Sequence, residues 1–226
     1  MSRLSNEIVT KALETQLFSG FSPAEAAELT DALGGAALSF AAGSVIAAAG
    51  QSASRPAPFL LLLSGQAQYV RYGLHGERCM IDYALPGSVL GIPQALGGEE
   101  SYHNSMIAGT DCFVLRLTPP AQGADASRLW PRMEQNLLRM EIDKGVRLMR
   151  KIDILSGRTV REKILIYLNY ESERCGSREF DIPLNRQALA DYIYVDRTTL
   201  SSELGNMQRD GIIQVRRNHF VLLEKR

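Results

Sequence analysis

The feature that most constrains the fold is residues 185–207, which read as two short helices separated by only three residues. Leu200, Leu204 and Met207 recur at helical spacing and give the second helix one apolar face. Asp196 is a good N-cap for that helix, and Gly211 permits a sharp exit after it. Two helices joined so closely must cross each other, so residues 185–192 and 196–207 predict a helix–turn–helix.

The flanking residues extend this motif into a winged helix. Residues 158–170 carry Val160, Ile164 and Leu168 on one helical face. After the motif, residues 212–226 read as two short strands around Arg217 and Asn218, which predicts a β-hairpin. We therefore expect residues 158–226 to form one domain.

Residues 38–117 show a different sequence pattern, in which short apolar stretches are separated by Gly, Pro and Ser. We expect strands at residues 38–40, 45–47, 59–63, 66–72, 78–83, 105–108 and 112–117. Many short strands at close spacing favour an antiparallel barrel or sandwich. Residues 3–33 precede it and are expected to be helical, with a helix start at Ser22, Pro23 and Glu25.

Residues 127–155 predict one long helix with a single apolar stripe. The expected stripe consists of Met133, Leu137, Met140, Lys144, Leu148, Ile152 and Leu155. Such a stripe needs a partner surface, and a second copy of the same helix is our prediction; the alternative is packing on the chain's own barrel. Ser156 and Gly157 are expected hinge residues. The predicted domains are residues 1–126, residues 127–157 (dimerisation helix and hinge) and residues 158–226.

Composition limits the function classes. The 226 residues contain 25 basic and 25 acidic side chains, so a polybasic coat is excluded, although residues 158–226 hold 12 basic and 10 acidic ones. The three cysteines are scattered without a CxxC pair, which excludes a disulfide framework and suits a reducing compartment. We find neither a signal-peptide pattern nor an apolar run of membrane-spanning length. These features predict a cytoplasmic protein without a membrane partner.

The motifs resemble those of the Crp/Fnr family of bacterial transcription regulators. The likeness is carried by LNRQALADYIYVDRTTLSSELGNMQRDGII at residues 184–213 and by FLLLLSGQAQYVRYGLHGERCMIDYALPGSVLGI at residues 59–92, with its PG-x-x-x-G ending. The resemblance implies an α+β fold: an N-terminal antiparallel β-roll (a cupin-like double-stranded β-helix) with flanking helices, a long dimerisation helix and a C-terminal winged helix–turn–helix. It also implies that residues 1–126 are an effector or sensor domain and that residues 158–226 are a DNA-binding domain.

The resemblance also implies a homodimer on double-stranded DNA with two-fold-related half-sites, with RNA polymerase as a further partner. Arg197 stands where the family reads a guanine edge, and we expect base contacts from Arg197, Thr198, Ser201 and Ser202. Phosphate contacts are expected from Asn185, Arg186, Gln187, Thr199, Arg216, Arg217, Asn218 and His219. The alternatives are that Arg197 pairs with Glu203 or Asp196, and that His219 is only an exposed turn residue.

The sensor domain lacks the family's cyclic-AMP signature. Cyclic-AMP-binding relatives have Glu directly after PG-x-x-x-G and an Arg-Ser pair further on, whereas this chain has Ile92 and Asn104-Ser105. A buried phosphate without an arginine partner is costly, so the sequence argues against cyclic AMP. We expect a less polar, unidentified small effector, or none. Its expected pocket is lined by Leu90, Gly91, Ile92, Asn104, Ser105 and Leu137.

Other cofactors do not fit the resemblance. No cysteine precedes Cys79, which argues against the family's N-terminal iron–sulfur cluster, and neither His75 nor Cys79 matches a haem-ligand position. A thiol switch at Cys79, Cys112 or Cys175 stays open. A cupin-type metal enzyme is disfavoured because the three histidines form no His-x-His. We predict an allosterically controlled DNA-binding regulator and no enzyme; the remaining alternative is a protein-interaction module with weak DNA binding.

Overall fold

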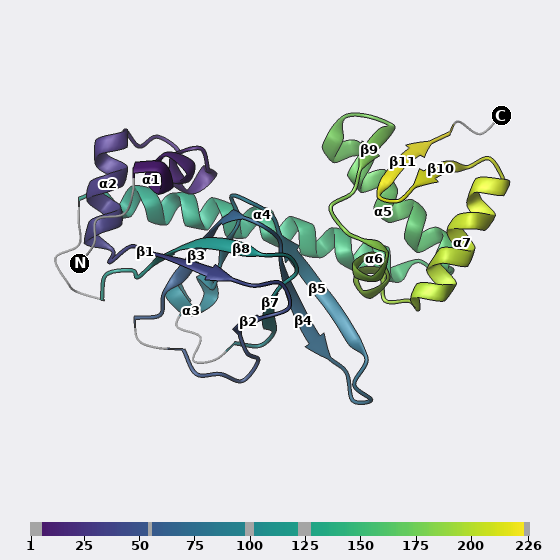
Figure 1. Ribbon diagram of the computed structural model, residues 1–226, viewed down its shortest axis with the longest axis horizontal. Helices are drawn as coiled ribbons and strands as arrows, with labels where there is room; N and C mark the ends of the chain where they lie inside the picture. The colour runs from purple at the N-terminus through teal and green to yellow at the C-terminus, as the bar shows by residue number, and fades with distance from the viewer. Residues whose placement is uncertain (1–5, 54–55, 98–101, 122–127, 224–226) are drawn as a thin grey trace. The chain divides into compact units, whose positions relative to one another are not determined.

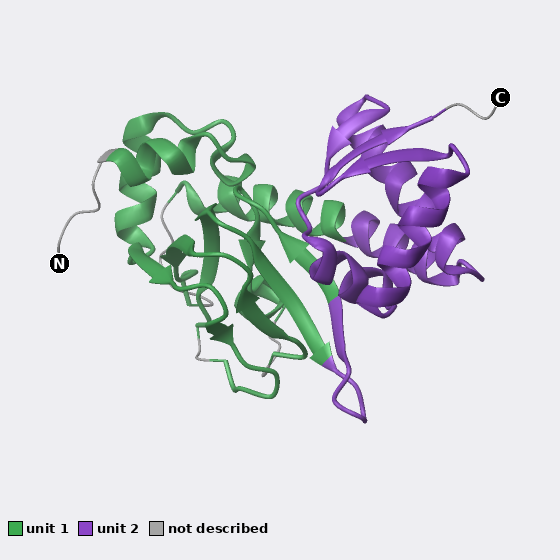
Figure 2. Cartoon of the chain, turned by 45° about the vertical axis from the view of Figure 1, so that its right-hand side comes forward, with its two compact units in different colours: residues 1–71, 81–144 green, residues 72–80, 145–226 purple. Residues whose placement is uncertain are grey.

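The computed structural model describes residues 6–53, 56–97, 102–121 and 128–223 (Figure 1). Sequence expectations that concern residues 1–5, 98, 127 and 224–226 lie outside these ranges. Internal packing divides the chain into two units, residues 1–71 with 81–144 and residues 72–80 with 145–226 (Figure 2). The expected boundaries after residues 126 and 157 stay a prediction.

The chain begins with helix α1 (Asn6–Leu13), a 3-10 turn η1 (Gln16–Phe18) and helix α2 (Pro23–Ala32). The expected start of α2 is confirmed as a reciprocal cap: the Ser22 N–H donates to Glu25 Oε2 at 2.9 Å, and the Glu25 N–H donates to Ser22 Oγ at 3.3 Å. These helices bury Leu17, Phe18 and Leu29 in a hydrophobic core that also holds residues of the roll.

Two four-stranded sheets form the β-roll. The first has the order β1 (Ala36–Phe40), β8 (Cys112–Leu117), β3 (Phe59–Ser64), β6 (Val89–Leu90). The second has the order β2 (Val45–Ala47), β7 (Ser105–Ala108), β4 (Ala67–Tyr72), β5 (Arg78–Ala84). Strands distant in sequence pair antiparallel, as in β1 with β8 and β2 with β7, which confirms the expected antiparallel β-roll. A second core between the sheets holds Leu62, Leu90 and Val114.

The PG-x-x-x-G segment turns sharply at both glycines. Gly87 and Gly91 have φ of 92° and 84°, a region that favours glycine over other residues. A Cβ on Gly91 would also lie 3.3 Å from the Pro58 carbonyl oxygen. Gly91 then caps a short helix α3 (Ile92–Leu96), which the sequence analysis did not predict.

Helix α4 (Trp130–Ser156) is the expected long helix, but its apolar residues form two faces rather than one stripe. Met133, Leu137 and Met140 are buried in the core beneath the N-terminal helices, so their assignment to a dimer surface is wrong. The packing alternative holds for this half of the helix. The large apolar side chains exposed along α4 are Leu138, Ile142, Val146, Met149, Ile152 and Leu155, of which Ile152 and Leu155 belong to the expected stripe.

The C-terminal elements are helix α5 (Val160–Cys175), strand β9 (Glu179–Asp181), helices α6 (Arg186–Ile193) and α7 (Arg197–Arg209), and strands β10 (Ile213–Arg216) and β11 (His219–Leu222). The sheet order β10-β11-β9 adds an unpredicted third strand to the expected hairpin. This arrangement is a winged helix–turn–helix. Among the helices of the described residues, we find none with both the length and the apolar character needed to span a membrane.

Candidate nucleic-acid interface

The helix–turn–helix is built from α6 and α7. The Asn185 side chain caps α6 by accepting a hydrogen bond from the Ala188 N–H at 2.9 Å. Asp196 occupies the N-cap of α7 without a side-chain cap hydrogen bond. The predicted inner face of α7 is confirmed, because Leu200, Leu204 and Met207 are at most 2 % exposed. The burial of that face fixes which side of α7 points outward.

The outward face of α7 carries the residues expected to contact bases. Arg197, Thr198, Thr199, Ser201 and Ser202 are all exposed. Among residues 6–53, 56–97, 102–121 and 128–223, no partner occupies the Arg197 guanidinium in an ion pair or hydrogen bond. The alternative that Arg197 pairs with Glu203 or Asp196 is therefore not seen.

Glu203 instead anchors α7 to α5. Arg161 donates its Nε–H to Glu203 Oε1, and its Nη1 lies 2.7 Å from Asp210 Oδ2. The Asn206 amide donates to Glu203 Oε2 at 3.0 Å. Hydrogen bonds from Arg161 and Asn206 hold the pKa of Glu203 below its ordinary value, so the carboxylate stays charged in this network.

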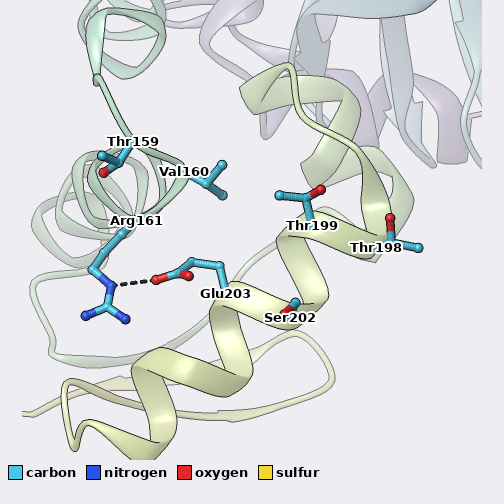
Figure 3. A pocket seen from close by; sticks show the side chains of 7 residues that line it. All are labelled: Thr159, Val160, Arg161, Thr198, Thr199, Ser202 and Glu203. Atoms are coloured by element: carbon cyan, nitrogen blue, oxygen red, sulfur yellow. Dashed lines mark hydrogen bonds and ion pairs between the residues drawn. The ribbon is translucent and has the colours of Figure 1, made fainter.

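A shallow hollow lies between the start of α5 and the first turns of α7 (Figure 3). Thr159, Val160 and Arg161 form one side, and four residues of α7 form the other: Thr198, Thr199, Ser202 and Glu203. Its volume is about 760 Å³. The hydroxyl groups that line it can donate hydrogen bonds to a polar surface such as the sugar–phosphate backbone.

The wing carries the second group of expected contacts. Arg216 and Arg217 are exposed, and Arg217 has a φ of 56°, a left-handed conformation unusual for a residue with a side chain. Arg186 donates to the Arg217 carbonyl oxygen at 3.0 Å and lies 5.8 Å from the centroid of the Phe220 ring. Partial burial lowers the pKa of Arg186, and its hydrogen bond to the Arg217 carbonyl oxygen supports the wing.

Three further expected phosphate contacts already have partners in the structure. The imidazole ring of His219 lies between two carboxylates. Its Nδ1 is 3.2 Å from Asp181 Oδ1, and its Nε2 is 3.1 Å from Glu179 Oε1. Those carboxylates would repel a phosphate. Gln187 donates to Asp191, and Asn185 caps α6. The structure favours Thr199, Arg216 and Arg217 as the accessible contacts, with half-buried Asn218 beside them.

The expected effector residues are not gathered around one cavity. Leu90 belongs to the core between the sheets, whereas Ile92 and Leu137 belong to the core beneath the N-terminal helices. Asn104 accepts a hydrogen bond from Arg71 Nε at 3.1 Å, and Ser105 accepts one from the Ala49 N–H at 3.1 Å. Gly91, the sixth residue of that set, is buried at the start of α3.

The cysteines differ in accessibility. Cys112 is buried, and its thiol lies within hydrogen-bonding distance of the Gln66 and Thr110 carbonyl oxygens. Burial raises the pKa of this thiol, which lowers its thiolate fraction and its reactivity. Cys79 is half-buried and Cys175 is exposed. A thiol switch at Cys112 is therefore disfavoured.

The sequence analysis missed Arg161, and it expected Arg186 to contact phosphate rather than to support the wing. Arg161 and Arg186 act through pairs separated by 42 and 31 residues, to Glu203 and to the Arg217 carbonyl. Periodicity reveals which face of a helix is buried but not which distant charge a surface arginine meets. The only local signal was the capping box of α5, formed by Thr159 and Glu162.

Comparisons with known proteins identify both domains. A Crp-like helix-turn-helix domain matches residues 162–226, and a cyclic nucleotide-binding domain matches residues 37–121. The transcriptional activator protein FnrL of Cereibacter sphaeroides is 27 % identical over 159 residues, which cover 66 % of this chain and 61 % of FnrL. The electron transport regulator A of Shewanella oneidensis is 21 % identical, covering 66 % and 60 %. The chain thus spans about 60 % of these curated relatives' length.

Solved structures share the fold. FixK2 from Bradyrhizobium japonicum has a TM-score of 0.65 at 17 % identity, covering 83 % of this chain and 92 % of that one. The c-di-GMP responsive global regulator CLP of Xanthomonas campestris has a TM-score of 0.68 at 16 % identity, covering 84 % and 95 %.

The two domain matches occur in the order that defines one class of protein, an effector-domain fold followed by a DNA-binding fold. The chain belongs to the Crp/Fnr family, which consists of transcription regulators and not of enzymes.

The wing gives a test that separates backbone strain from DNA contact. We expect Arg217→Gly to leave the free energy of unfolding within about 1 kcal/mol of the parent, because relief of the left-handed strain offsets the added chain entropy. Affinity for random-sequence duplex DNA should fall, because a phosphate contact is lost. Urea unfolding and fluorescence anisotropy measure the two quantities. A large loss of stability, or unchanged DNA affinity, would contradict this assignment.

Proposed function

We propose that this chain is a homodimeric, sequence-specific DNA-binding transcription regulator with α7 as its recognition helix. The observation that carries the proposal is that Arg197, in the first turn of α7, is exposed and has no partner among the described residues. Arg161 anchors the same helix by its hydrogen bond to Glu203. Arg is the commonest reader of guanine in the major groove. Thr198, Ser201 and Ser202 complete the exposed face. Such a regulator acts on the chromosome, which for a bacterial protein means the cytoplasm.

The wing and the hollow supply contacts to the DNA backbone in this proposal. Thr199, Arg216 and Arg217 are exposed, and the hydroxyl-lined hollow borders the same face of α7. Few cations take part, so we expect binding to depend on salt with a modest slope.

The exposed apolar face of α4 supports the homodimer. Leu138, Ile142, Gly145, Met149 and Ile152 follow one another at alternating steps of four and three residues, the spacing of a coiled-coil seam. The four large apolar side chains in this seam are each at least 60 % exposed, and Gly145 has open space around it. Exposed apolar surface of this regularity favours a second copy of the same helix.

The β-roll suits an effector domain, and we propose that its ligand is not a cyclic nucleotide. Where cyclic-AMP-binding relatives carry Glu and Arg-Ser, this chain has the buried Ile92 and the pair Asn104-Ser105. Asn104 accepts a hydrogen bond from Arg71, which is itself exposed. An exposed guanidinium cannot replace a buried one as partner of a cyclic phosphate.

Base reading is tested by comparing two arginines. Using a site selected by the full chain from random duplexes, we expect Arg197→Ala to lower affinity for the selected site roughly 10–100-fold while leaving random-sequence affinity nearly unchanged. Arg216→Ala should weaken both alike and reduce the salt slope by about one. Equal losses on both DNAs for both variants would favour an interaction module with nonspecific DNA contact instead.

The seam is tested by placing a charge in it. Ile142→Glu would bury a carboxylate between two helices, so we expect a shift from dimer to monomer mass in light scattering. Asp143→Lys, on an exposed neighbouring position outside the seam, is the matched control and should stay dimeric. A dimeric Ile142→Glu protein would disprove the seam.

Ligand exclusion is tested directly. Titration calorimetry of the micromolar full chain with cyclic AMP, and separately with cyclic GMP, should give no binding heat, because Asn104-Ser105 replaces the Arg-Ser pair that would hold the phosphate. Saturable binding of either nucleotide would show that the proposal about the effector is wrong.

A further inference from the structure

The hairpin that joins β4 to β5 packs in the same compact unit as the winged domain. Residues 72–80 belong to the unit formed with residues 145–226 (Figure 2). The hairpin is closed by the Gly73 N–H, which donates to the Glu77 carbonyl oxygen at 2.9 Å. The hairpin contacts the helix–turn–helix through side chains of residues 77 and 78.

The main contact is an ion pair between Arg78 and Asp191. Arg78 Nη1 donates to Asp191 Oδ2, and Gln187 donates to the other carboxylate oxygen at 2.8 Å. The Asp191 side chain lies on α6 and is only 8 % exposed. A carboxylate this deeply buried needs a counter-charge, so Arg78 holds the hairpin on the first helix of the motif.

A buried lysine fastens the base of the hairpin. Lys151, in the second half of α4, is 5 % exposed and donates to the Met80 carbonyl oxygen at 3.1 Å. The same ammonium group lies 3.6 Å from the centroid of the Tyr192 ring, on α6. Lys151 thus ties α4, the start of β5 and α6 together.

A strained residue in the turn of the motif reaches the hairpin. Tyr194 has a φ of 56°, a left-handed conformation in which glycine is the usual residue. Its hydroxyl donates to Glu77 Oε1 at 3.4 Å, and the negative charge of Glu77 raises the pKa of Tyr194. Strain of this kind persists where the side chain has a task that offsets it.

The hairpin also places a negative charge beside the DNA-reading end of α7. One hollow of about 600 Å³ is lined by Glu77 and Arg78 of the hairpin together with Arg197 and Thr198 of α7. DNA phosphates that approach this end would meet the Glu77 carboxylate and the hairpin backbone. Both effects oppose binding.

We propose that the hairpin is an autoinhibitory latch, held by Arg78 on Asp191 and by Glu77 on Tyr194, which must leave the helix–turn–helix before α7 can enter the major groove. The proposal rests on the proposed DNA-binding function and adds its regulation. The hairpin continues directly into β4 and β5, so an effector that shifts either strand changes the equilibrium between the latched and released forms.

The test uses the sign of a charge effect. Removal of a cation from a DNA-binding protein ordinarily weakens binding. If Arg78 holds the latch, Arg78→Gln of the full chain instead raises affinity for a random 30-base-pair duplex by about tenfold, a typical allosteric coupling. Arg116→Gln, which removes an exposed cation from β8, is the matched control and should cause no increase. Fluorescence anisotropy at constant salt measures both.

A second variant guards against effects on folding. Tyr194→Gly fits the left-handed backbone and removes the Glu77 contact, so it should raise DNA affinity in the same direction, whereas Tyr194→Phe removes only the hydroxyl and should act more weakly. Combining Arg78→Gln with Asp191→Asn should add nothing to the stronger single effect, because both remove one ion pair.

The outcomes separate the two proposals. Unchanged or weakened DNA binding by folded Arg78→Gln and Tyr194→Gly proteins, with Arg197→Ala still impairing site recognition, would overturn the latch and leave the DNA-binding proposal intact. Absence of DNA binding by the parent and by every variant would overturn both.

Discussion

The fold depends on one helix, α4, presenting two apolar faces in different directions. Met133, Leu137 and Met140 complete the chain's own core, while Leu138, Ile142 and Met149 point outward. A helix clamped in this way cannot rotate about its axis without breaking the core, which is closely packed. If a second copy covers the outer face, the same helix forms part of both the dimer seam and the sensor core. A shift of α4 that changes the packing of one face would then change the packing of the other.

The recognition helix is oriented by charges rather than by apolar burial alone. The inner face of α7 is fixed by Leu200 and Leu204, but rotation and tilt are further restrained by Arg161 on Glu203 and Asp210. The same network removes Glu203 as a partner for Arg197. A side chain without an intramolecular partner loses less on binding DNA, because no internal ion pair must first be broken.

Sequence patterns located most of the elements and misplaced one surface. The α6 and α7 helices, the wing hairpin and the longer strands carry local signals: caps, periodicity and turn residues. The first half of the expected stripe on α4, Met133 to Met140, was assigned to the wrong face, whereas Ile152 and Leu155 are exposed as expected. Two apolar stripes on one helix overlap in sequence, and spacing alone does not tell which one the roll covers. The short β6 and β9, and α3, are too brief to show a period.

The features beyond prediction are pairs between distant residues. Arg78 and Asp191 lie 113 residues apart, and each reads in sequence as an ordinary surface charge. Tyr194 is a local irregularity, since its left-handed backbone conformation is one that glycine usually adopts. This strained backbone is informative because the Tyr194 side chain contacts Glu77 of the hairpin, a contact that glycine could not make.

The small basic excess of the DNA-binding domain has a structural explanation. Five of its ten arginines form hydrogen bonds inside the domain: Arg161, Arg174, Arg178, Arg186 and Arg209. Arg197, Arg216 and Arg217 are exposed on the surfaces we assign to DNA. Since nonspecific affinity grows with the number of phosphates neutralised, arginines that are engaged inside the domain add little to affinity for random DNA. In the homodimer that we propose, two subunits on matched half-sites would supply the selectivity, so the outer face of α4 would matter for recognition together with α7.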